Sequence, residues 1–222
     1  MKKILFASAL ALFTAANAQT TFGLKGGFAL SKLTSNEDLD AFEGVDGGLK
    51  SKAGFYVGAL VEHKFNNKFA VQGEVQYANL GGKAEVSMSG ITVTENFNLN
   101  RIVIPVSARY YATPDFAVYA GPFVSIKTGT KVNIDVSGGI ADPQLLDEAE
   151  SFLEESFDDG LKSAEFGLFL GADYNVYKGL FVDARYSFGL SNMIKDPVAD
   201  EKMRMNFFQI GIGYNSSNSK LK

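Results

Sequence analysis

Eight segments of the chain alternate apolar and polar residues over about ten positions each, and this pattern restricts the fold more than any other feature. Alternate side chains of a β-strand point to opposite faces, so each segment predicts a strand with one apolar and one polar face. The connections do not supply a helix to cover each strand, which favours an all-β fold with a closed antiparallel sheet. The segments are Phe22–Leu33, Lys52–Lys64, Phe69–Asn79, Arg101–Tyr110, Phe116–Lys127, Ala164–Tyr174, Leu180–Gly189 and Arg204–Tyr214.

The connections between these segments alternate in length. Three are tight turns rich in Asn, Pro and Gly, namely Phe65–Lys68, Tyr111–Asp115 and Asn175–Gly179. The long connections are Thr34–Ser51, Leu80–Asn100, Thr128–Ser163 and Leu190–Met203. Short turns at one end and long loops at the other are typical of a transmembrane barrel with periplasmic turns and extracellular loops. The pattern therefore predicts an eight-stranded, up-and-down transmembrane β-barrel with both chain ends on the periplasmic side.

The first residues predict export. A basic start at Met1-Lys2-Lys3 precedes an apolar run from Ile4 to Ala16, which is too short for a spanning helix. Ala16-Asn17-Ala18 has the small-x-small pattern of a signal-peptidase site. We expect a signal peptide at residues 1–18 and an outer-membrane barrel at residues 19–214, followed by the polar tail Asn215–Lys222. An uncleaved N-terminal anchor is the alternative.

Composition excludes several classes of site and partner. The chain has no Cys, which rules out disulfides, zinc-thiolate sites and thiol nucleophiles. Its net charge of −4 gives no excess of basic residues to displace counterions from nucleic acid. We therefore expect no cofactor, no metal and no nucleic-acid partner.

The polar faces separate a membrane barrel from a soluble, lipocalin-like barrel. They carry many glycines, which weaken a water-exposed strand but suit a narrow lumen that mixes small and long side chains. The apolar faces place Phe or Tyr near the ends of most strands, like the aromatic girdles of a bilayer interface. The favoured arrangement places the apolar faces against lipid and the polar, charged faces in the lumen. The glycines are Gly23, Gly27, Gly58, Gly121, Gly167, Gly171, Gly211 and Gly213.

Several short motifs resemble the PorT-like outer-membrane β-barrel family of Bacteroidetes. They are Phe22-Gly23-Leu24-Lys25-Gly26-Gly27-Phe28, Ile104-Pro105-Val106, Tyr119-Ala120-Gly121-Pro122, and the strands Gly167–Tyr174 and Phe207–Tyr214. The resemblance covers essentially the whole mature chain and implies an outer-membrane location and an eight-stranded barrel. Barrels of this type usually finish on an aromatic strand, whereas a polar tail follows Tyr214 here. The family's namesake is linked to protein secretion, a role that the permissive glycine motifs do not carry over.

Nine charged residues fall on the predicted luminal face. Both signs are present, so one interpretation is a salt-bridged polar core that fills the lumen and fixes the strand register. The other interpretation is a gated path for small ions, since eight strands leave too little room for a general porin. The nine residues are Lys25, Glu62, Glu74, Arg101, Arg109, Glu165, Asp173, Asp183 and Arg185.

The long connections contain two further elements. Asp142–Gly160 has the apolar spacing of an amphipathic helix, with a capping Asp before Pro143. It is either a solvated helix across the barrel mouth or a site for a divalent cation or a basic partner. Ala84–Met88 and Ile91–Phe97 predict a hairpin beyond the membrane, and Lys127–Ser137 lengthens the neighbouring strand; a protruding edge can recruit another chain. The acidic residues are Asp142, Asp147, Glu148, Glu150, Glu154, Glu155, Asp158 and Asp159.

No catalytic signature is present. His63 is the only histidine, and it falls beside a short turn with the parity of the apolar face, which suits an interfacial side chain. We therefore expect a non-enzymatic outer-membrane barrel with a surface-binding or membrane-stabilising role. Its partners would be outer-membrane lipid and either an extracellular protein or divalent cations at the loops. The alternatives are a gated ion channel and an accessory component of a secretion or gliding machinery.

Overall fold

A computed structural model describes residues 20–35, 46–88, 90–138, 142–197 and 200–216. The expected signal peptide at residues 1–18 lies outside these ranges, as does the tail after Ser216.

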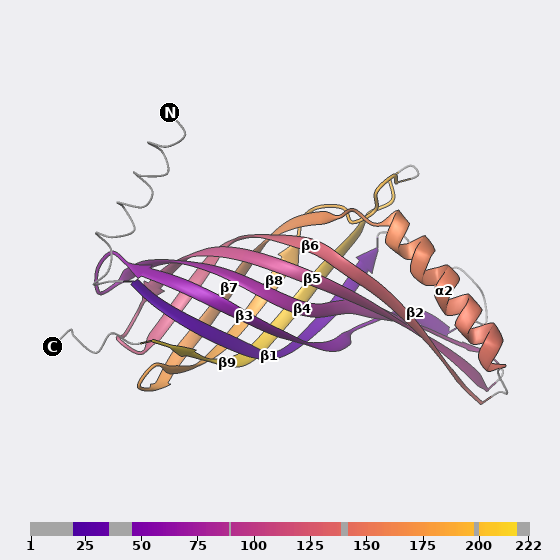
Figure 1. The fold of residues 1–222 in the computed structure, drawn as a ribbon, viewed down its shortest axis with the longest axis horizontal. Coiled ribbons are helices and arrows are strands. Elements are labelled where there is room, and N and C mark those ends of the chain that lie inside the picture. Colours follow the sequence, from indigo (N-terminus) through magenta and orange to yellow (C-terminus); the bar gives the residue numbers. More distant parts are fainter. Residues whose placement is uncertain (1–19, 36–45, 89, 139–141, 198–199, 217–222) are drawn as a thin grey trace.

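Eight strands close into a barrel (Figure 1). Each strand of the ring pairs antiparallel with the next one along the chain, and the first pairs with the last to complete the ring. The predicted all-β barrel is confirmed. The strands are β1 (Thr20–Ser35), β3 (Lys52–Lys64), β4 (Phe69–Met88), β5 (Ile91–Tyr111), β6 (Phe116–Ser137), β7 (Ala164–Tyr177), β8 (Leu180–Gly189) and β9 (Met203–Asn215).

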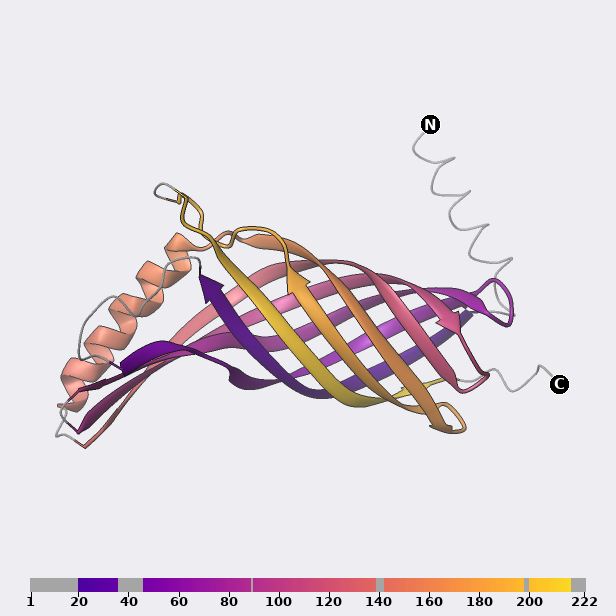
Figure 2. The same cartoon turned by 180° about the vertical axis from the view of Figure 1, so that it is seen from behind.

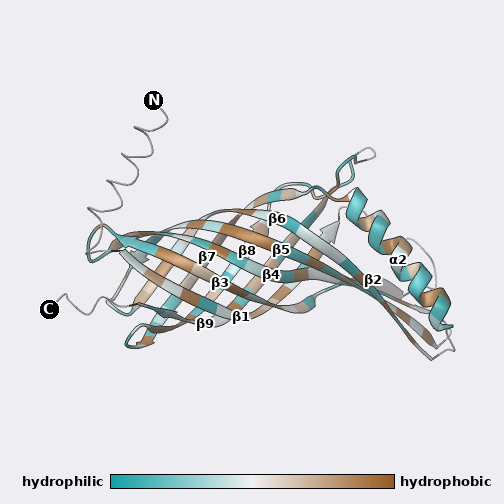
Figure 3. Ribbon diagram, in the orientation of Figure 1, coloured by the Kyte–Doolittle hydropathy of each residue, from teal (hydrophilic) through white to brown (hydrophobic). Residues whose placement is uncertain are grey.

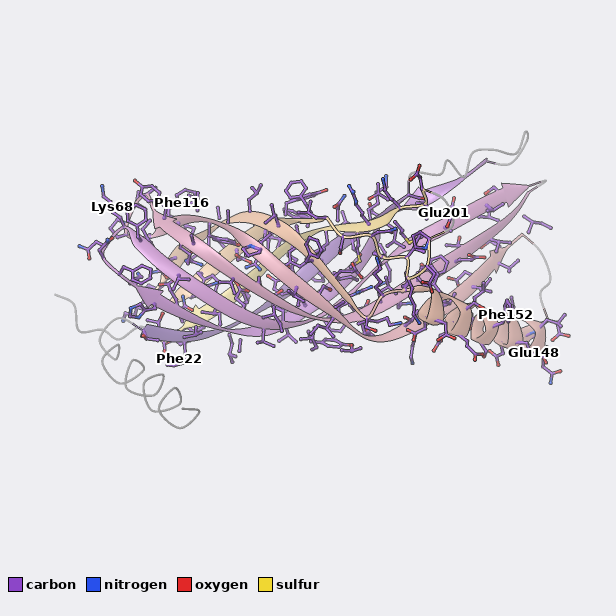
Figure 4. The ribbon with its side chains drawn as sticks, turned by 90° about the horizontal axis from the view of Figure 1, so that it is seen from above. Phe22, Lys68, Phe116, Glu148, Phe152 and Glu201 are labelled. Carbon is purple, nitrogen blue, oxygen red and sulfur yellow. The ribbon has the colours of Figure 1, made fainter. Side chains whose placement is uncertain are left out.

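The three tight turns gather at one end of the barrel. In the β3–β4 turn the Asn66 side chain accepts hydrogen bonds from the backbone of Lys68 and Phe69 at 2.8 and 2.9 Å. In the β7–β8 turn Lys178 and Gly179 both have positive φ, of 43° and 90°, which suits a two-residue hairpin. Figure 4 shows Phe22, Lys68 and Phe116 at this end and Glu148, Phe152 and Glu201 at the opposite end.

Three strands continue well beyond the barrel at the long-loop end. The predicted hairpin is confirmed, since β4 and β5 stay paired up to Met88 and Ile91, and β6 pairs with β5 as far as Ser137. The region Leu80–Asn100 is therefore mostly strand and not loop. A further short strand, β2 (Asp46–Lys50), pairs with the extended part of β4 and was not predicted. β2 has only five residues, and they do not alternate between apolar and polar types, so the sequence pattern did not indicate a strand there.

The predicted acidic helix is present as α2 (Pro143–Gly160). Asp142 caps its start by accepting a hydrogen bond from Gln144 N at 2.9 Å. The helix lies along the projecting strands and not across the barrel mouth (Figure 2), because its apolar side finds a partner there: Phe157 stacks on Phe97 with ring centroids 4.7 Å apart. Within the described ranges, no helix is long and apolar enough to cross a membrane.

Hydrophilic and hydrophobic residues alternate along the strands of the barrel wall (Figure 3), and the two faces are inverted relative to a water-soluble protein. Outward-pointing apolar side chains are widely accessible, with Phe28 at 76% exposure and Leu24 at 66%. On β4 the outward apolar positions run from Phe69 to Tyr77, a span of nine residues. A tilted strand needs about 9–11 residues to cross a bilayer. This band faces lipid, and the charged face points inward.

We call the part beyond this band the extracellular projection: β2, residues 79–88 of β4, 91–100 of β5, 128–137 of β6, and α2. The barrel carries it on one side of its mouth (Figures 1 and 2).

Candidate functional site

The structure places all nine charged residues named from the polar faces inside the barrel. Each is at most 9% exposed. A buried charge is tolerated only when it is paired and hydrogen-bonded, so the partners of each residue decide what the interior can do.

A first group lies near the short turns. Arg109 forms ion pairs with Glu62 (Nε to Oε2, 2.9 Å) and Asp173 (Nη2 to Oδ2, 2.5 Å). The Tyr111 hydroxyl donates to Glu62 at 2.7 Å. A polar cavity of about 110 Å³ adjoins this group and is lined in part by Glu62, Tyr111, Asp173 and Phe181. The polar interior is thus reachable from the periplasmic end.

A second group fills the middle of the barrel around Glu74. This carboxylate pairs with Lys25 at 3.0 Å and with Arg185 at 2.6 Å. Lys25 also pairs with Asp183 at 3.1 Å, so four charged residues from three strands form one network. Such a network ties β1, β4 and β8 together across the lumen and is consistent with a role in fixing register.

A third pair, Arg101 and Glu165, is separate from both groups. It joins β5 to β7, and the Arg101 side chain is fully buried.

Polar residues that the charge pattern did not single out complete the network. The amides of Gln72 and Gln76 donate to Glu74 at 2.7 and 2.5 Å, and the Tyr119 hydroxyl donates to Asp183. Tyr56 lies 3.4 Å from the same carboxylate. The sequence feature that could have indicated these residues was their position on the polar faces of the predicted strands.

The inward glycines make room for these large side chains. A Cβ at Gly171 would lie 2.5 Å from the Tyr119 hydroxyl oxygen, and one at Gly211 would lie 2.5 Å from the Tyr56 hydroxyl oxygen. Real Cβ atoms do not approach other heavy atoms so closely. The glycine-rich face therefore complements specific luminal tyrosines.

An apolar cluster occupies much of the extracellular half of the interior, beside the Arg101–Glu165 pair. Phe123 and Phe207 meet edge to face with centroids 5.6 Å apart, and Phe169 is buried with them. Leu161 and Met193 join this cluster from the connections at the mouth. We call this cluster the apolar layer: Ala29, Leu33, Ala78, Leu80, Leu99, Val103, Phe123, Leu161, Phe169, Met193, Met205 and Phe207. Sequence alternation could not place Leu161 and Met193, because they lie outside the predicted strands.

Three of the eight acidic residues of the helix region have structural partners. Besides the cap at Asp142, Glu150 accepts a hydrogen bond from Ile134 N at 2.7 Å. Asp158 pairs with Lys127 at 2.9 Å and accepts from Thr130 Oγ1 at 2.6 Å. The Thr130 hydrogen bond and the Lys127 charge hold the pKa of Asp158 below its ordinary value. Asp147, Glu148, Glu154, Glu155 and Asp159 remain on the surface of α2.

The acidic surface does not assemble into a metal site. Among the described residues, no group of three or more His, Asp or Glu side chains is arranged to hold a metal ion. Glu154, Glu155 and Asp158 instead line an open groove of about 430 Å³ between α2 and β6.

His63 is half-buried at the short-turn end. Its Nδ1 lies 3.0 Å from Thr20 Oγ1, and its ring meets Phe65 edge to face.

The barrel, its lipid-facing band and its charged interior agree with a comparison of the sequence with protein families. Residues 17–195 match the family described as outer membrane protein beta-barrel domain. The chain belongs to this family. Membership places the protein in the outer membrane.

Solved structures similar to this family member include other outer-membrane proteins. Ail from Yersinia pestis, solved with the heparin analogue sucrose octasulfate, is 13% identical with a TM-score of 0.45, over 89% of this chain and 99% of Ail. OprG from Pseudomonas aeruginosa is 16% identical with a TM-score of 0.40, over 89% and 96%. Neisserial surface protein A is 16% identical with a TM-score of 0.42, over 87% and 95%. No curated protein matches the sequence.

Proposed function

We propose that this outer-membrane barrel is a non-enzymatic surface protein whose projection captures an extracellular protein. The observation that carries the proposal is the ordered sheet and helix standing beyond the lipid-facing band. The strands β4, β5 and β6 continue there as paired strands, and α2 covers one face of them. A barrel that served only as a membrane anchor would not need an ordered structure outside the membrane.

Helix α2 offers the features of a binding surface for a basic protein. Leu145 is 65% exposed and Phe152 is 70% exposed, on a helix whose other apolar side chains include the docked Phe157. An accessible aromatic anchor surrounded by charged residues is typical of interaction hot spots. The surface carboxylates around Phe152 favour a positively charged partner over a divalent cation, which needs several converging ligands.

The filled interior argues against transport as the main role. Ions that entered from the periplasmic cavity would meet paired charges and then the apolar layer, where hydration is lost. A gated ion path therefore needs the aromatic side chains of that layer to move. We keep this channel as the second candidate, supported by the polar chain of groups that reaches mid-barrel.

The half-buried position of His63 at the short-turn end, in edge-to-face contact with Phe65, suits an interfacial side chain and supports a non-catalytic role. We also propose export by a signal peptide at residues 1–18, and membership of the PorT-like group of Bacteroidetes from the glycine motif at Phe22–Phe28. A secretion or gliding accessory role would make the partner a component of that machinery.

Two measurements test the proposal on refolded full-length mature protein. Proteins from a cell-surface extract are captured on the wild type, on a variant lacking residues 142–159, and on Phe152→Ala, then compared by quantitative mass spectrometry. We expect basic proteins to be lost from both variants. The matched control is Phe28→Ala, which removes an equally exposed ring from the lipid-facing wall. Identical captured sets from all four proteins would overturn the proposal.

The second measurement is conductance in planar bilayers, with heat-modifiable gel mobility as the folding control. We expect no channel openings from the wild type. Discrete, reproducible openings that disappear in Arg185→Ala would instead establish the channel.

A further inference from the structure

Three lysines gather where the projection leaves the barrel. Lys50 lies in β2, Lys52 at the start of β3, and Lys83 in β4. Lys50 and Lys83 are directly opposite each other in the β2–β4 register, so they share one face of the sheet. Like charges directly opposite across two strands are destabilising. We call these three residues the lysine cluster.

Acidic side chains only partly neutralise the lysine cluster. Lys50 pairs with Glu85 at 2.6 Å. Lys52 is 6% exposed and donates to the neutral Asn79 Oδ1 at 2.6 Å. In the part of the chain that the structure describes, Lys83 forms no ion pair. Burial and the Lys83 charge together lower the pKa of Lys52, which lies outside the membrane-spanning band. An added anion would relieve this excess of positive charge.

The position of the lysine cluster relative to lipid indicates which anion is available. Tyr77 is the last outward apolar residue of β4, and Asn79, Gly81 and Lys83 follow on the same face. Six residues of strand rise roughly 20 Å, or about 15 Å along the membrane normal for a strand tilted by about 40°. Lys83 thus stands beyond the outer boundary of the lipid-facing band, on the headgroup side of the membrane.

The same outward face carries a row of hydrogen-bonding amides. Asn79 donates to Asn100 at 2.8 Å, and Asn98 donates to Asn133 at 3.1 Å. Phe97 faces the other way, toward α2, so the acidic helix lies on the opposite side of the sheet from Lys83. The two faces of the projection therefore differ in charge. The amide and lysine face continues the lipid-facing wall upward.

We infer that Lys50 and Lys83, the accessible members of the lysine cluster, bind a phosphate group on the saccharide headgroup of an outer-leaflet glycolipid. Ammonium groups supply charge-assisted hydrogen bonds to phosphate oxygens, and the neighbouring amides suit sugar hydroxyls. The site is independent of the partner proposed for α2, because it lies on the other face of the sheet.

The test uses full-length mature protein refolded in zwitterionic micelles, with purified lipopolysaccharide as the probe and the same material after enzymatic removal of phosphate as its comparison. The wild type should bind the phosphorylated form at least tenfold more tightly. Lys83→Gln should lose about tenfold in affinity, as expected for one charge-assisted contact. Lys131→Gln is the matched control: it removes one exposed lysine from the same sheet face in β6 and should change affinity less than twofold.

A second readout separates loss of binding from loss of folding. Without glycolipid, Lys83→Gln should melt at a slightly higher temperature than the wild type, because a like-charge pair is removed. With phosphorylated glycolipid, the wild type should gain more in melting temperature than the variant.

Three results would overturn the assignment. They are equal binding of the dephosphorylated probe, equal losses in Lys83→Gln and Lys131→Gln, and binding of inorganic phosphate as tight as that of the glycolipid. The last result would identify a soluble anion in place of a lipid.

Discussion

The barrel interior and the extracellular projection use the same charged residue types in opposite ways. Inside, Glu74 has a side chain 1% exposed and is held between Lys25 and Arg185. On the projection, Asp158 has a side chain 43% exposed and pairs with the single cation Lys127. A buried carboxylate depends strongly on its partners, whereas an accessible one stays partly hydrated and depends on them less. Burial thus separates charges whose pairing the fold requires from charges, such as Asp158, whose pairing contributes little.

The largest effect that would sharpen this contrast is expected at Glu74. Glu74→Ala leaves Lys25 and Arg185 buried without a shared counterion, and should cost about 3–5 kcal/mol in the free energy of unfolding. Urea titration of heat-modifiable mobility in micelles measures it. Glu85→Ala, which breaks the exposed pair with Lys50 on the projection, should cost less than about 1 kcal/mol. Equal losses would break the contrast between interior and projection.

The next effect concerns space in the lumen and not charge. Gly171→Ala brings a Cβ against Tyr119 and should destabilise the barrel by about 1–3 kcal/mol. Adding Tyr119→Leu should recover part of that loss. Gly160→Ala at the end of α2 is the matched control, because a Cβ there meets nothing within 4 Å. A neutral Gly171→Ala would show that the lumen tolerates repacking.

A smaller effect is expected where α2 docks on the projection. Phe157→Ala removes the ring stacked on Phe97 and should weaken helix docking by about 1–2 kcal/mol. Hydrogen exchange of α2 amides should accelerate while the melting temperature of the barrel stays unchanged. Phe152→Ala, which removes an exposed ring from the same helix, should leave exchange as it was.

The smallest effect is a dependence of helix docking on pH. The pKa of Asp158 is lowered from its ordinary value of 3.8, so its stabilising contribution is full above about pH 4. That contribution is lost as the pH falls through the lowered pKa of the docked state. The protection factors of amides in the C-terminal turn of α2, which correct for the intrinsic pH dependence of exchange, should therefore fall below pH 4 in the wild type. Asp158→Asn should show the lower protection at every pH, and wild-type protection factors insensitive to acid would contradict the prediction.

The strands, their order and the direction of their faces could be predicted from the sequence, because lipid outside and charge inside impose a two-residue period on each wall segment. The extension of β4 to Met88 was predictable only as a hairpin, since its residues face water and lose the lipid-facing pattern. The pairing of Glu74 with Lys25 and Arg185 was not predictable. It depends on the stagger between strands, which alternation within each strand leaves open.

The apolar layer was the main feature that sequence reasoning missed. Phe123 and Phe207 have the parity of the polar faces, and Met193 lies in a connection without any period. Only the closed barrel brings them together. Likewise, the docking of α2 along β6 depended on an apolar partner at Phe97 that no local pattern near the helix reveals.

The pairing of β1 with β9 has a consequence for how the protein is made. Leu24 pairs with Tyr214, 190 positions later along the chain (214 − 24). Contacts between such distant residues form slowly, because a long loop of chain must close before any hydrogen bond is gained. Until the final strand arrives, β1 and β8 each present an open edge that can pair with another chain and aggregate. Assembly of the ring therefore finishes in a single closing step, and the chain needs protection from other strands during the whole time before it.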